Sequence, residues 1–256
     1  MDLPASFHDL KGKSVFITGG GSGIGECLVE GFLSQGCKVA FVDRLDSIAL
    51  CDRLEKAYGA RPLFIECDIT DIAALQAAIA EARTAHGPID VLVNNAADDT
   101  RHYVSSYTPD DWDHSIAVNL RPHYFTAQAV VDDMRVAGGG VIVNFSSIAY
   151  MMGGGEYPAY AAAKAGITGL TRGLARELGP ARIRVNALMP GWVLTERQKR
   201  LWAKPEALAA HIARQCLNEE IRPVDMVCPA LFLASEASRM MTGQALVVDA
   251  GVVFSG

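Results

Sequence analysis

The stretch Ser14–Gly25, SVFITGGGSGIG, decides the fold. Its first five residues form a short apolar run, which predicts a buried parallel strand. A glycine-rich turn follows, and residues 26–35 then place apolar side chains at helical spacing. A strand, a glycine turn and a helix in this order predict a loop whose backbone approaches a pyrophosphate at the N-terminus of the helix. Gly19, Gly23 and Gly25 are spaced G-x-x-x-G-x-G, which differs from the standard G-x-G-x-x-G fingerprint.

The same alternation continues along the chain and predicts an α/β fold. Strands are expected at residues 38–42, 62–66, 89–93, 141–145, 182–188 and 245–248, and helices at residues 45–58, 71–86, 109–136, around 160–164, 192–216 and 223–234. Such βαβ units predict one domain over residues 1–256, with a Rossmann-type, doubly wound parallel sheet and helices on both faces. Ligands bind at the carboxyl ends of such strands, where Asp43, Asp68, Asn95 and Ser147 are all expected.

The acid at the end of the second strand bears on the choice of cofactor. Asp43 lies eighteen residues beyond Gly25, close to the spacing of about 20 at which an acid binds the adenosine ribose hydroxyls. Its carboxylate would repel a 2′-phosphate, and Ser22 stands where a basic residue could have bound one. Both features favour NAD. Arg44 leaves NADP open, because a guanidinium beside the ribose accommodates that phosphate.

Tyr160 and Lys164 form the expected catalytic pair. They are four residues apart on a predicted helix, so they share one face. An ammonium beside a phenol lowers the tyrosine pKa from about 10, and such a tyrosine exchanges a proton with an alcohol or carbonyl. Ser147 follows the apolar run 141–145, and a loop through Gly153–Gly155 could bring its hydroxyl to the phenol. Taken alone, the Y-x-x-x-K pattern is more typical of a surface helix pair.

The long predicted helix over residues 109–136 contains a disturbance. Asn119 is a poor residue for a helix interior, and Pro122 leaves the carbonyl of Val118 without its helical partner. We expect a kink that exposes backbone carbonyl and the Asn119 amide to a water in the active site.

Composition excludes several classes of function. The formal charge of −6 and the pI near 5.5 argue against nucleic-acid and anionic-membrane partners. The basic run Arg197–Arg200 is expected to be a solvated helix face. No apolar run approaches the roughly 20 residues of a membrane span, and the N-terminus lacks a signal region, so a cytoplasmic protein is expected. The cysteines lack disulfide or metal-ligand spacing and are expected to be small buried apolar residues, with no metal site: Cys27, Cys37, Cys51, Cys67, Cys216 and Cys228.

Two further regions are candidates for substrate contacts. Residues 192–216 leave the carboxyl end of a strand and are expected to be either a lid or a plain surface helix. Polar residues on the loops that face the site are Asp98, Asp99, Arg101, His102 and Glu156, and each could equally be a solvated loop residue.

Taken together, the ordered motifs resemble those of the short-chain dehydrogenase/reductase family over nearly the whole chain. They are Thr18–Gly25, Cys67-Asp68-Ile69, the catalytic four residues, and NNAA at Asn94–Ala97, where Ala97 replaces a glycine. The resemblance implies a catalytic set of Asn119, Ser147, Tyr160 and Lys164. It implies a cofactor site of Gly19, Ser22, Gly23, Ile24, Gly25, Asp43, Arg44, Asp68, Ile69, Asn95, Ala96, Tyr160, Lys164, Pro190, Gly191, Val193 and Thr195.

Some stretches are similar to bacterial aldose 1-dehydrogenases of the galactose/arabinose/fucose type, among them NNAADDTRH and PGWVLTERQKRLW. This implies oxidation of an aldose at C1 to the aldonolactone with NAD, or NADP, in a homodimer or homotetramer. The expected substrate residues are Asp99, His102, Ser147, Glu156 and Tyr160. The alternatives are a family member acting on a non-sugar secondary alcohol or ketone, and a non-catalytic nucleotide-binding protein.

Overall fold

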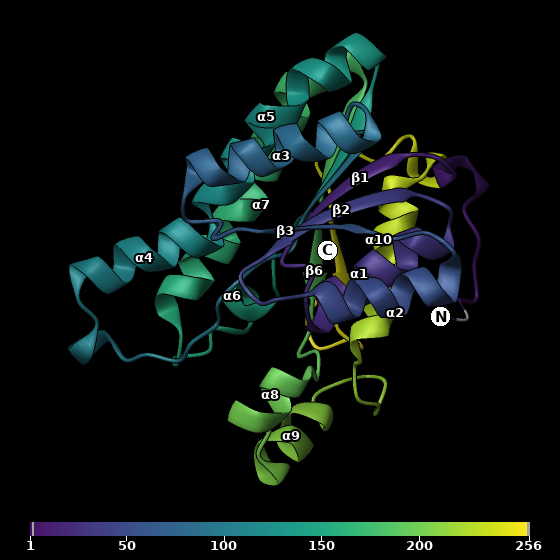
Figure 1. The fold of residues 1–256 in the computed structure, drawn as a ribbon. Helices are drawn as coiled ribbons and strands as arrows, with labels where there is room; N and C mark the ends of the chain where they lie inside the picture. The colour runs from purple at the N-terminus through teal and green to yellow at the C-terminus, as the bar shows by residue number, and fades with distance from the viewer. Residues whose placement is uncertain (2, 255–256) are drawn as a thin grey trace.

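One parallel sheet organises the molecule, as the alternation predicted. Within residues 1 and 3–254, which the computed structural model describes, seven strands lie in the order β3-β2-β1-β4-β5-β6-β7 (Figure 1). The order reverses between β1 and β4, and this is the place where a doubly wound sheet opens its ligand crevice. The strands are β1 Ser14–Thr18, β2 Lys38–Asp43, β3 Leu63–Glu66, β4 Val91–Asn94, β5 Gly140–Phe145, β6 Ile183–Pro190 and β7 Ala245–Val248.

Helices cover both faces of the sheet (Figure 1). One layer holds α1 Gly23–Ser34, α2 Ile48–Tyr58 and α10 Val227–Ala234, and the other holds α3 Ile72–His86, α5 Arg121–Ala137 and α7 Pro158–Leu178. Successive strand residues point to opposite faces, so Val15 and Ile17 pack in the first core while Phe16 packs in the second. Burial on both faces explains why the strands are continuous apolar runs rather than alternating ones.

The remaining elements are short and lie mostly at the edges of the fold. They are α4 Pro109–Asn119, α6 Ala149–Met152, α8 Glu196–Leu201, α9 Pro205–Ile212, and the 3₁₀ turns η1 His8–Leu10, η2 Val104–Ser106, η3 Gly179–Ala181, η4 Pro223–Met226 and η5 Glu236–Ser238. The single helix expected over 192–216 is therefore two short helices, which project beyond the sheet in Figure 1. Residues 202–204 separate them, and Lys204 has extended backbone angles because the residue before a proline, here Pro205, avoids helical ones.

The predicted kink in the helix over 109–136 is a complete break. Leu120 separates α4 from α5 and has φ −132° and ψ −52°. Pro122 lacks an N–H and begins the new helix within its first turn, where that donor is not needed. The break ends α4 at Asn119 and gives this side chain a fixed place beside the sheet.

A chain of buried polar side chains joins the sheet to the helices around the site. Asn94 on β4 donates to Asn144 on β5 (3.0 Å) and accepts from Thr126 on α5 (2.8 Å). Asn144 in turn donates to Thr171 on α7 (3.1 Å). Because buried polar groups are costly unless they are paired, these bonds fix how α5 and α7 lie on the sheet.

Among the described residues, no helix has the length and apolar character that crossing a bilayer requires. The same part of the chain contains no cluster of three or more metal-ligating side chains. The expectation that all six cysteines are buried is wrong for Cys216, which is exposed because it lies in the loop after α9, and Cys27 and Cys228 are only partly buried.

Candidate active site

A cavity of about 1720 Å³ opens at the carboxyl ends of the strands. Each predicted cofactor residue lines it, which brings together residues from six separate loops: Gly19, Ser22, Gly23, Ile24, Gly25, Asp43, Arg44, Asp68, Ile69, Asn95, Ala96, Tyr160, Lys164, Pro190, Gly191, Val193 and Thr195. The loops after β1, β2, β3, β4, β5 and β6 all contribute, as expected for parallel strands that end at the same edge.

The glycine loop has the shape of a phosphate cradle. Gly19 and Gly23 have φ of +69° and +57°, angles that side chains rarely adopt. A Cβ at Gly25 would lie 1.7 Å from the carbonyl oxygen of Gly19, so only glycine fits there. Asn95 also donates to that carbonyl (3.0 Å) and holds the loop against β4. The N-terminus of α1 therefore faces the cavity with its free N–H groups, and the site fits a dinucleotide pyrophosphate.

Asp43 and Arg44 are both occupied at the end of β2. One carboxylate oxygen of Asp43 accepts from the Gly21 N–H (2.8 Å), and the other accepts from the Leu45 N–H (3.0 Å). The Arg44 guanidinium lies 3.7 Å from the Asp68 carboxylate, with both side chains largely exposed. The Asp43 carboxylate thus lies where an adenosine ribose is expected. The neighbouring Arg44 is paired with an acid, Asp68.

Tyr160 and Lys164 lie on one face of α7, next to the end of β5. The Lys164 ammonium donates to the carbonyl of Phe145 (2.8 Å) and lies 5.5 Å from the centre of the Tyr160 ring. Ser147 follows Phe145 by two residues, and its hydroxyl accepts from the Ala149 N–H (3.1 Å). Ser147, Tyr160 and Lys164 all line the cavity, so the three expected catalytic side chains meet.

The pKa values of this pair differ from the expectation. We expected Lys164 to lower the pKa of Tyr160, but desolvation raises the pKa of the phenol above its ordinary value, and the charge of Asp99 adds to the rise. Ser147 lies beside the phenol and opposes this change in its pKa. Lys164 is the group whose pKa falls, to about 7, because burial disfavours its charged form. The ammonium is bonded to Phe145 rather than to the phenol oxygen, so it does not offset the desolvation of the phenol.

Asn119 has a different local role from the one expected. Its side-chain oxygen accepts from the Asp98 N–H (2.9 Å), and its amide nitrogen donates to the Asp98 carbonyl (3.0 Å). The side chain is 1% exposed, so the hypothesis that its amide faces a water is wrong for the side chain. The amide instead brackets the backbone of Asp98 and positions the loop after β4.

The expected substrate residues divide into two groups. Asp99 and Glu156 line the cavity together with Ser147 and Tyr160. His102 does not itself line the cavity. Its Nε2 accepts from the Ala159 N–H (3.1 Å) in the first turn of α7, and its Nδ1 lies 3.2 Å from the Thr100 carbonyl. The imidazole of His102 thus accepts a hydrogen bond from one of the N–H groups at the start of α7 that have no partner within the helix.

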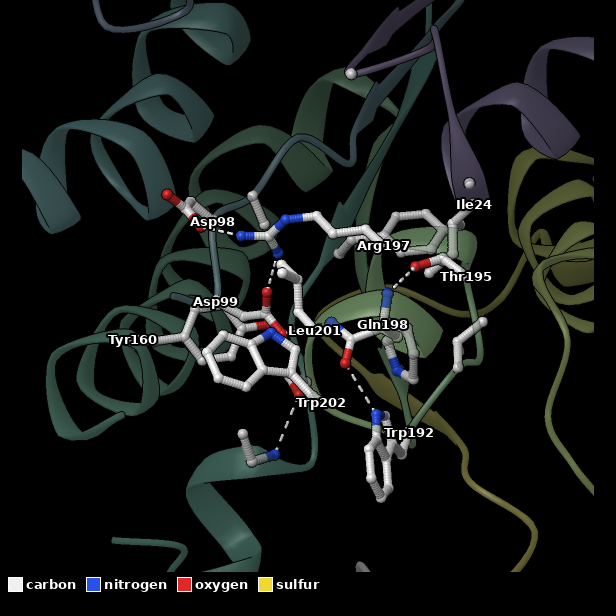
Figure 2. A pocket seen from close by; sticks show the side chains of 18 of the residues that line it. Ile24, Asp98, Asp99, Tyr160, Trp192, Thr195, Arg197, Gln198, Leu201 and Trp202 are labelled. Carbon is white, nitrogen blue, oxygen red and sulfur yellow. Dashed lines mark hydrogen bonds and ion pairs between the residues drawn. The ribbon is translucent and has the colours of Figure 1, made fainter. Parts of the chain in front are cut away.

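Residues of the segment 192–216 close one side of the cavity, and the sequence prediction missed most of them. Figure 2 shows Arg197 reaching from α8 to Asp98 and Asp99. The basic run at 197–200 is therefore not simply a solvated face, as we expected. Trp202 also contacts the loop after β4. The Arg101 guanidinium lies 5.2 Å from the centre of the Trp202 ring and 4.2 Å from the centre of the Tyr157 ring. The sequence does show an acidic pair after β4, Asp98 and Asp99, and a basic run after β6, at residues 197–200. It does not show that the two are in contact.

Comparisons with known proteins agree with this geometry. Residues 19–253 match a family model described as enoyl-(acyl carrier protein) reductase. The chain is 50% identical over 255 residues to "Probable galactose dehydrogenase GalD" of Rhizobium meliloti, covering 98% of this chain and 100% of that protein. It is 44% identical over 248 residues to the D-xylose 1-dehydrogenase of Caulobacter vibrioides, covering 96% and 98%.

Solved structures show the same architecture. A short-chain dehydrogenase/reductase from Serratia marcescens superposes with a TM-score of 0.89 at 32% identity, covering 96% of this chain and 99% of that one. A 3-oxoacyl-[acyl-carrier protein] reductase from Brucella melitensis gives 0.91 at 32% identity, covering 100% and 99%. With the glycine cradle, the parallel sheet and the Ser-Tyr-Lys set in one cavity, the chain belongs to the short-chain dehydrogenase/reductase family and is an NAD(P)-dependent oxidoreductase.

Proposed function

We propose that this enzyme oxidises a cyclic aldose at C1 to the aldonolactone and uses NAD. The observation that carries the proposal is the polar character of the cavity around Tyr160. Asp99, Arg101 and Glu156 line it together with Tyr160. A sugar ring offers several hydroxyls, each of which needs a donor or acceptor when it is buried, whereas a large apolar alcohol would leave these groups unpaired. The sugar dehydrogenases among the relatives support the same substrate class.

In the proposed reaction, Tyr160 takes the proton from the C1 hydroxyl. A bound oxidised nicotinamide would supply a positive charge and the acceptor for the hydride of C1. Ser147 hydrogen-bonds the reacting oxygen as its charge changes. Lys164 holds the cofactor ribose. The break in the helix after Asn119 would place a water there that joins Lys164 to solvent.

The preference for NAD rests on the end of β2. Asp43 is held by two backbone N–H groups of the adjoining loops, so its carboxylate cannot turn aside for a 2′-phosphate without losing both bonds. Arg44, the residue that left NADP open, pairs with Asp68.

The decisive experiment is a substrate panel that is run with NAD and with NADP in parallel. Aldoses and non-sugar secondary alcohols are offered at matched concentrations, and reduction of the nicotinamide is followed by absorbance. We expect turnover of aldoses with NAD at a higher kcat/KM than with NADP, and a lactone among the products by NMR. Turnover confined to secondary alcohols would contradict the substrate class, and no turnover with intact dinucleotide binding would indicate a non-catalytic binding protein.

We also propose that residues 192–216 are a substrate lid. Support comes from their place at the cavity: α8 and α9 are short and project beyond the sheet, and the segment contributes Trp192, Arg197 and Trp202 to the lining (Figures 1 and 2).

A homodimer or homotetramer is proposed as the assembled state. Trp112 on α4 and Tyr124 on α5 are 45% and 49% exposed, and Gly169 on α7 has no neighbour within 4 Å of the position its Cβ would take. Exposed aromatic side chains beside a slim helix suit an interface between subunits. Light scattering coupled to size-exclusion chromatography tests this, and a monomer at micromolar concentration would contradict it.

A further inference from the structure

Asp99 joins the lid to the catalytic pair. It lies in the loop after β4, and its side chain is 18% exposed. Its charge acts on the protons of both Tyr160 and Lys164. A carboxylate in such a place has two options: it accepts a hydrogen bond from the phenol and keeps the phenol protonated, or it is satisfied by other donors.

Two residues of α8 supply those other donors. Arg197 donates to one carboxylate oxygen of Asp99, and Gln198 donates to the other oxygen at 2.6 Å. The second nitrogen of the Arg197 guanidinium donates to Asp98 (2.8 Å), so the arginine spans both acids. Gln198 is itself oriented, because its amide oxygen accepts from the Trp192 indole (2.9 Å), as Figure 2 shows. Both oxygens of Asp99 are thus turned toward the lid.

We propose that Arg197 and Gln198 are positioning residues for the reaction, because they hold Asp99 on the lid and prevent it from accepting a hydrogen bond that would keep the Tyr160 phenol protonated. The inference rests on the proposed function and deepens it. The other charged or titratable groups that face Tyr160 are Lys164 on α7, Tyr157 at its N-terminus and Arg101 of the loop after β4. The only acid among the groups that act on both members of the pair in the described chain is Asp99.

Lid position and proton transfer are therefore linked. With the lid closed, Asp99 is engaged and the phenol is free to exchange its proton with substrate. With the lid open, Asp99 loses both donors and is free to accept a hydrogen bond from Tyr160. That hydrogen bond would hold the proton on the phenol and suppress the reaction until the lid has closed.

The test is the pH profile of kcat/KM for sugar oxidation. The wild-type enzyme should lose activity at low pH as Tyr160 becomes protonated. Arg197→Met should move this acidic limb upward by roughly 0.5 to 1 pH unit, the size expected when a carboxylate gains access to a phenol. On the limb, kcat/KM should fall roughly 3- to 10-fold, with recovery at high pH. Arg197→Lys should restore most of the wild-type profile.

The double variant separates positioning from a merely structural role. Asp99→Asn carries no charge to release, so adding Arg197→Met to it should leave the limb where Asp99→Asn alone puts it. Arg172→Met removes a charge from an exposed position on α7 that does not line the cavity, and it should not move the limb. The inference is overturned if Arg197→Met changes only KM, or if its shift persists in the Asp99→Asn background.

Dinucleotide affinity and circular dichroism establish that each variant is folded. Failure of the proposed function has a different signature, namely that the wild-type enzyme oxidises no aldose. The same profiles are then recorded with whichever alcohol is turned over, and a wild-type enzyme that turns over none also overturns the inference.

Discussion

At the scale of single residues, burial acts on Tyr160 and Lys164 in opposite directions. It raises the pKa of the phenol and lowers that of the amine to about 7, because in each case the charged form is disfavoured. Without bound ligand the pair therefore prefers to be neutral. The proposed reaction needs the phenolate, so we expect it to depend on charges that arrive with the cofactor.

Replacing Tyr160 by Phe tests the assigned base. The ring is retained and the hydroxyl is lost, so we expect kcat to fall by a factor on the order of 10² to 10⁴, the usual contribution of a general acid–base. NAD affinity, measured by fluorescence titration, should change little, because the glycine cradle is untouched. Tyr150→Phe is the control, since that hydroxyl lies 3.4 Å from Thr168 outside the cavity lining. Substantial kcat in Tyr160→Phe would contradict the assignment.

Lys164 predicts a pH dependence of stability. Its pKa is about 7 in the folded chain and 10.5 in the unfolded chain, so between these values the unfolded state binds more protons. The contribution of Lys164 to folding is therefore fully present above pH 10.5 and is lost as the pH falls through 7. Stability should rise with pH in this window, by up to about 1.4 kcal/mol per unit.

The measurement is denaturant unfolding without dinucleotide at about pH 7.5 and about pH 9.5, compared with Lys164→Met. The variant has no charge to bury, so its rise in unfolding free energy between the two pH values should be smaller. Equal rises in both proteins would show that Lys164 is protonated normally when folded.

At the scale of elements, the glycine loop depends on a close approach of two backbone segments. Gly25→Ala would place a Cβ 1.7 Å from the Gly19 carbonyl, so the loop must open. We expect at least a tenfold loss of dinucleotide affinity and a loss of stability of roughly 1 to 3 kcal/mol. Gly179→Ala is the matched control, because it has helical angles and no neighbour within 4 Å. Dinucleotide affinity is measured by calorimetric titration and stability by thermal unfolding. Equal losses in Gly25→Ala and Gly179→Ala would contradict the argument.

Local pattern was sufficient for the elements that carry the cofactor site. The strand ends and the glycine turn follow from apolar runs and backbone chemistry, so the sequence alone places residues such as Asp43 and Ser147 at one edge of the sheet, where both line the cavity. Pro122 likewise predicted the disturbance after Asn119, though not that it would divide one helix into two. These predictions succeed because the physical cause lies within a few residues of the effect.

The features of the site that the sequence did not reveal depend on contacts that are distant in sequence. His102 is adjacent to a motif, but the donor it satisfies is Ala159, 57 residues away. Arg197 belongs to a run that suggested a solvated face, but its partners are 98 and 99 residues away. The pKa of Tyr160 depends on how far the pocket excludes water, which helical spacing does not reveal. Tertiary packing decides each of these cases.

At the scale of the whole molecule, a firmly packed sheet carries a peripheral pair of short helices. Cofactor residues come from the sheet, whereas α8 and α9 are held to the site by Arg197, Gln198 and Trp202. Such peripheral elements open more easily than the core. Hydrogen exchange with mass spectrometry should show slower exchange over residues 192–216 when NAD and a substrate analogue are bound, with little change in β4 and β5. Unchanged exchange over 192–216 would contradict a lid.

The backbone bracket of Asn119 on Asp98 has a consequence for engineering. The backbone of Asp98 is hydrogen-bonded to the Asn119 side chain, and the carboxylate of Asp98 is hydrogen-bonded to Arg197. Substitutions in the lid that are meant to change sugar preference can therefore act on Asp98 through Arg197. Through Asp98 they can also act on Asn119, at the junction between α4 and α5. Substitutions at residues 203–212 avoid these contacts. Substitutions at Arg197 or Asp98 would change substrate selectivity and the position of the loop after β4 together.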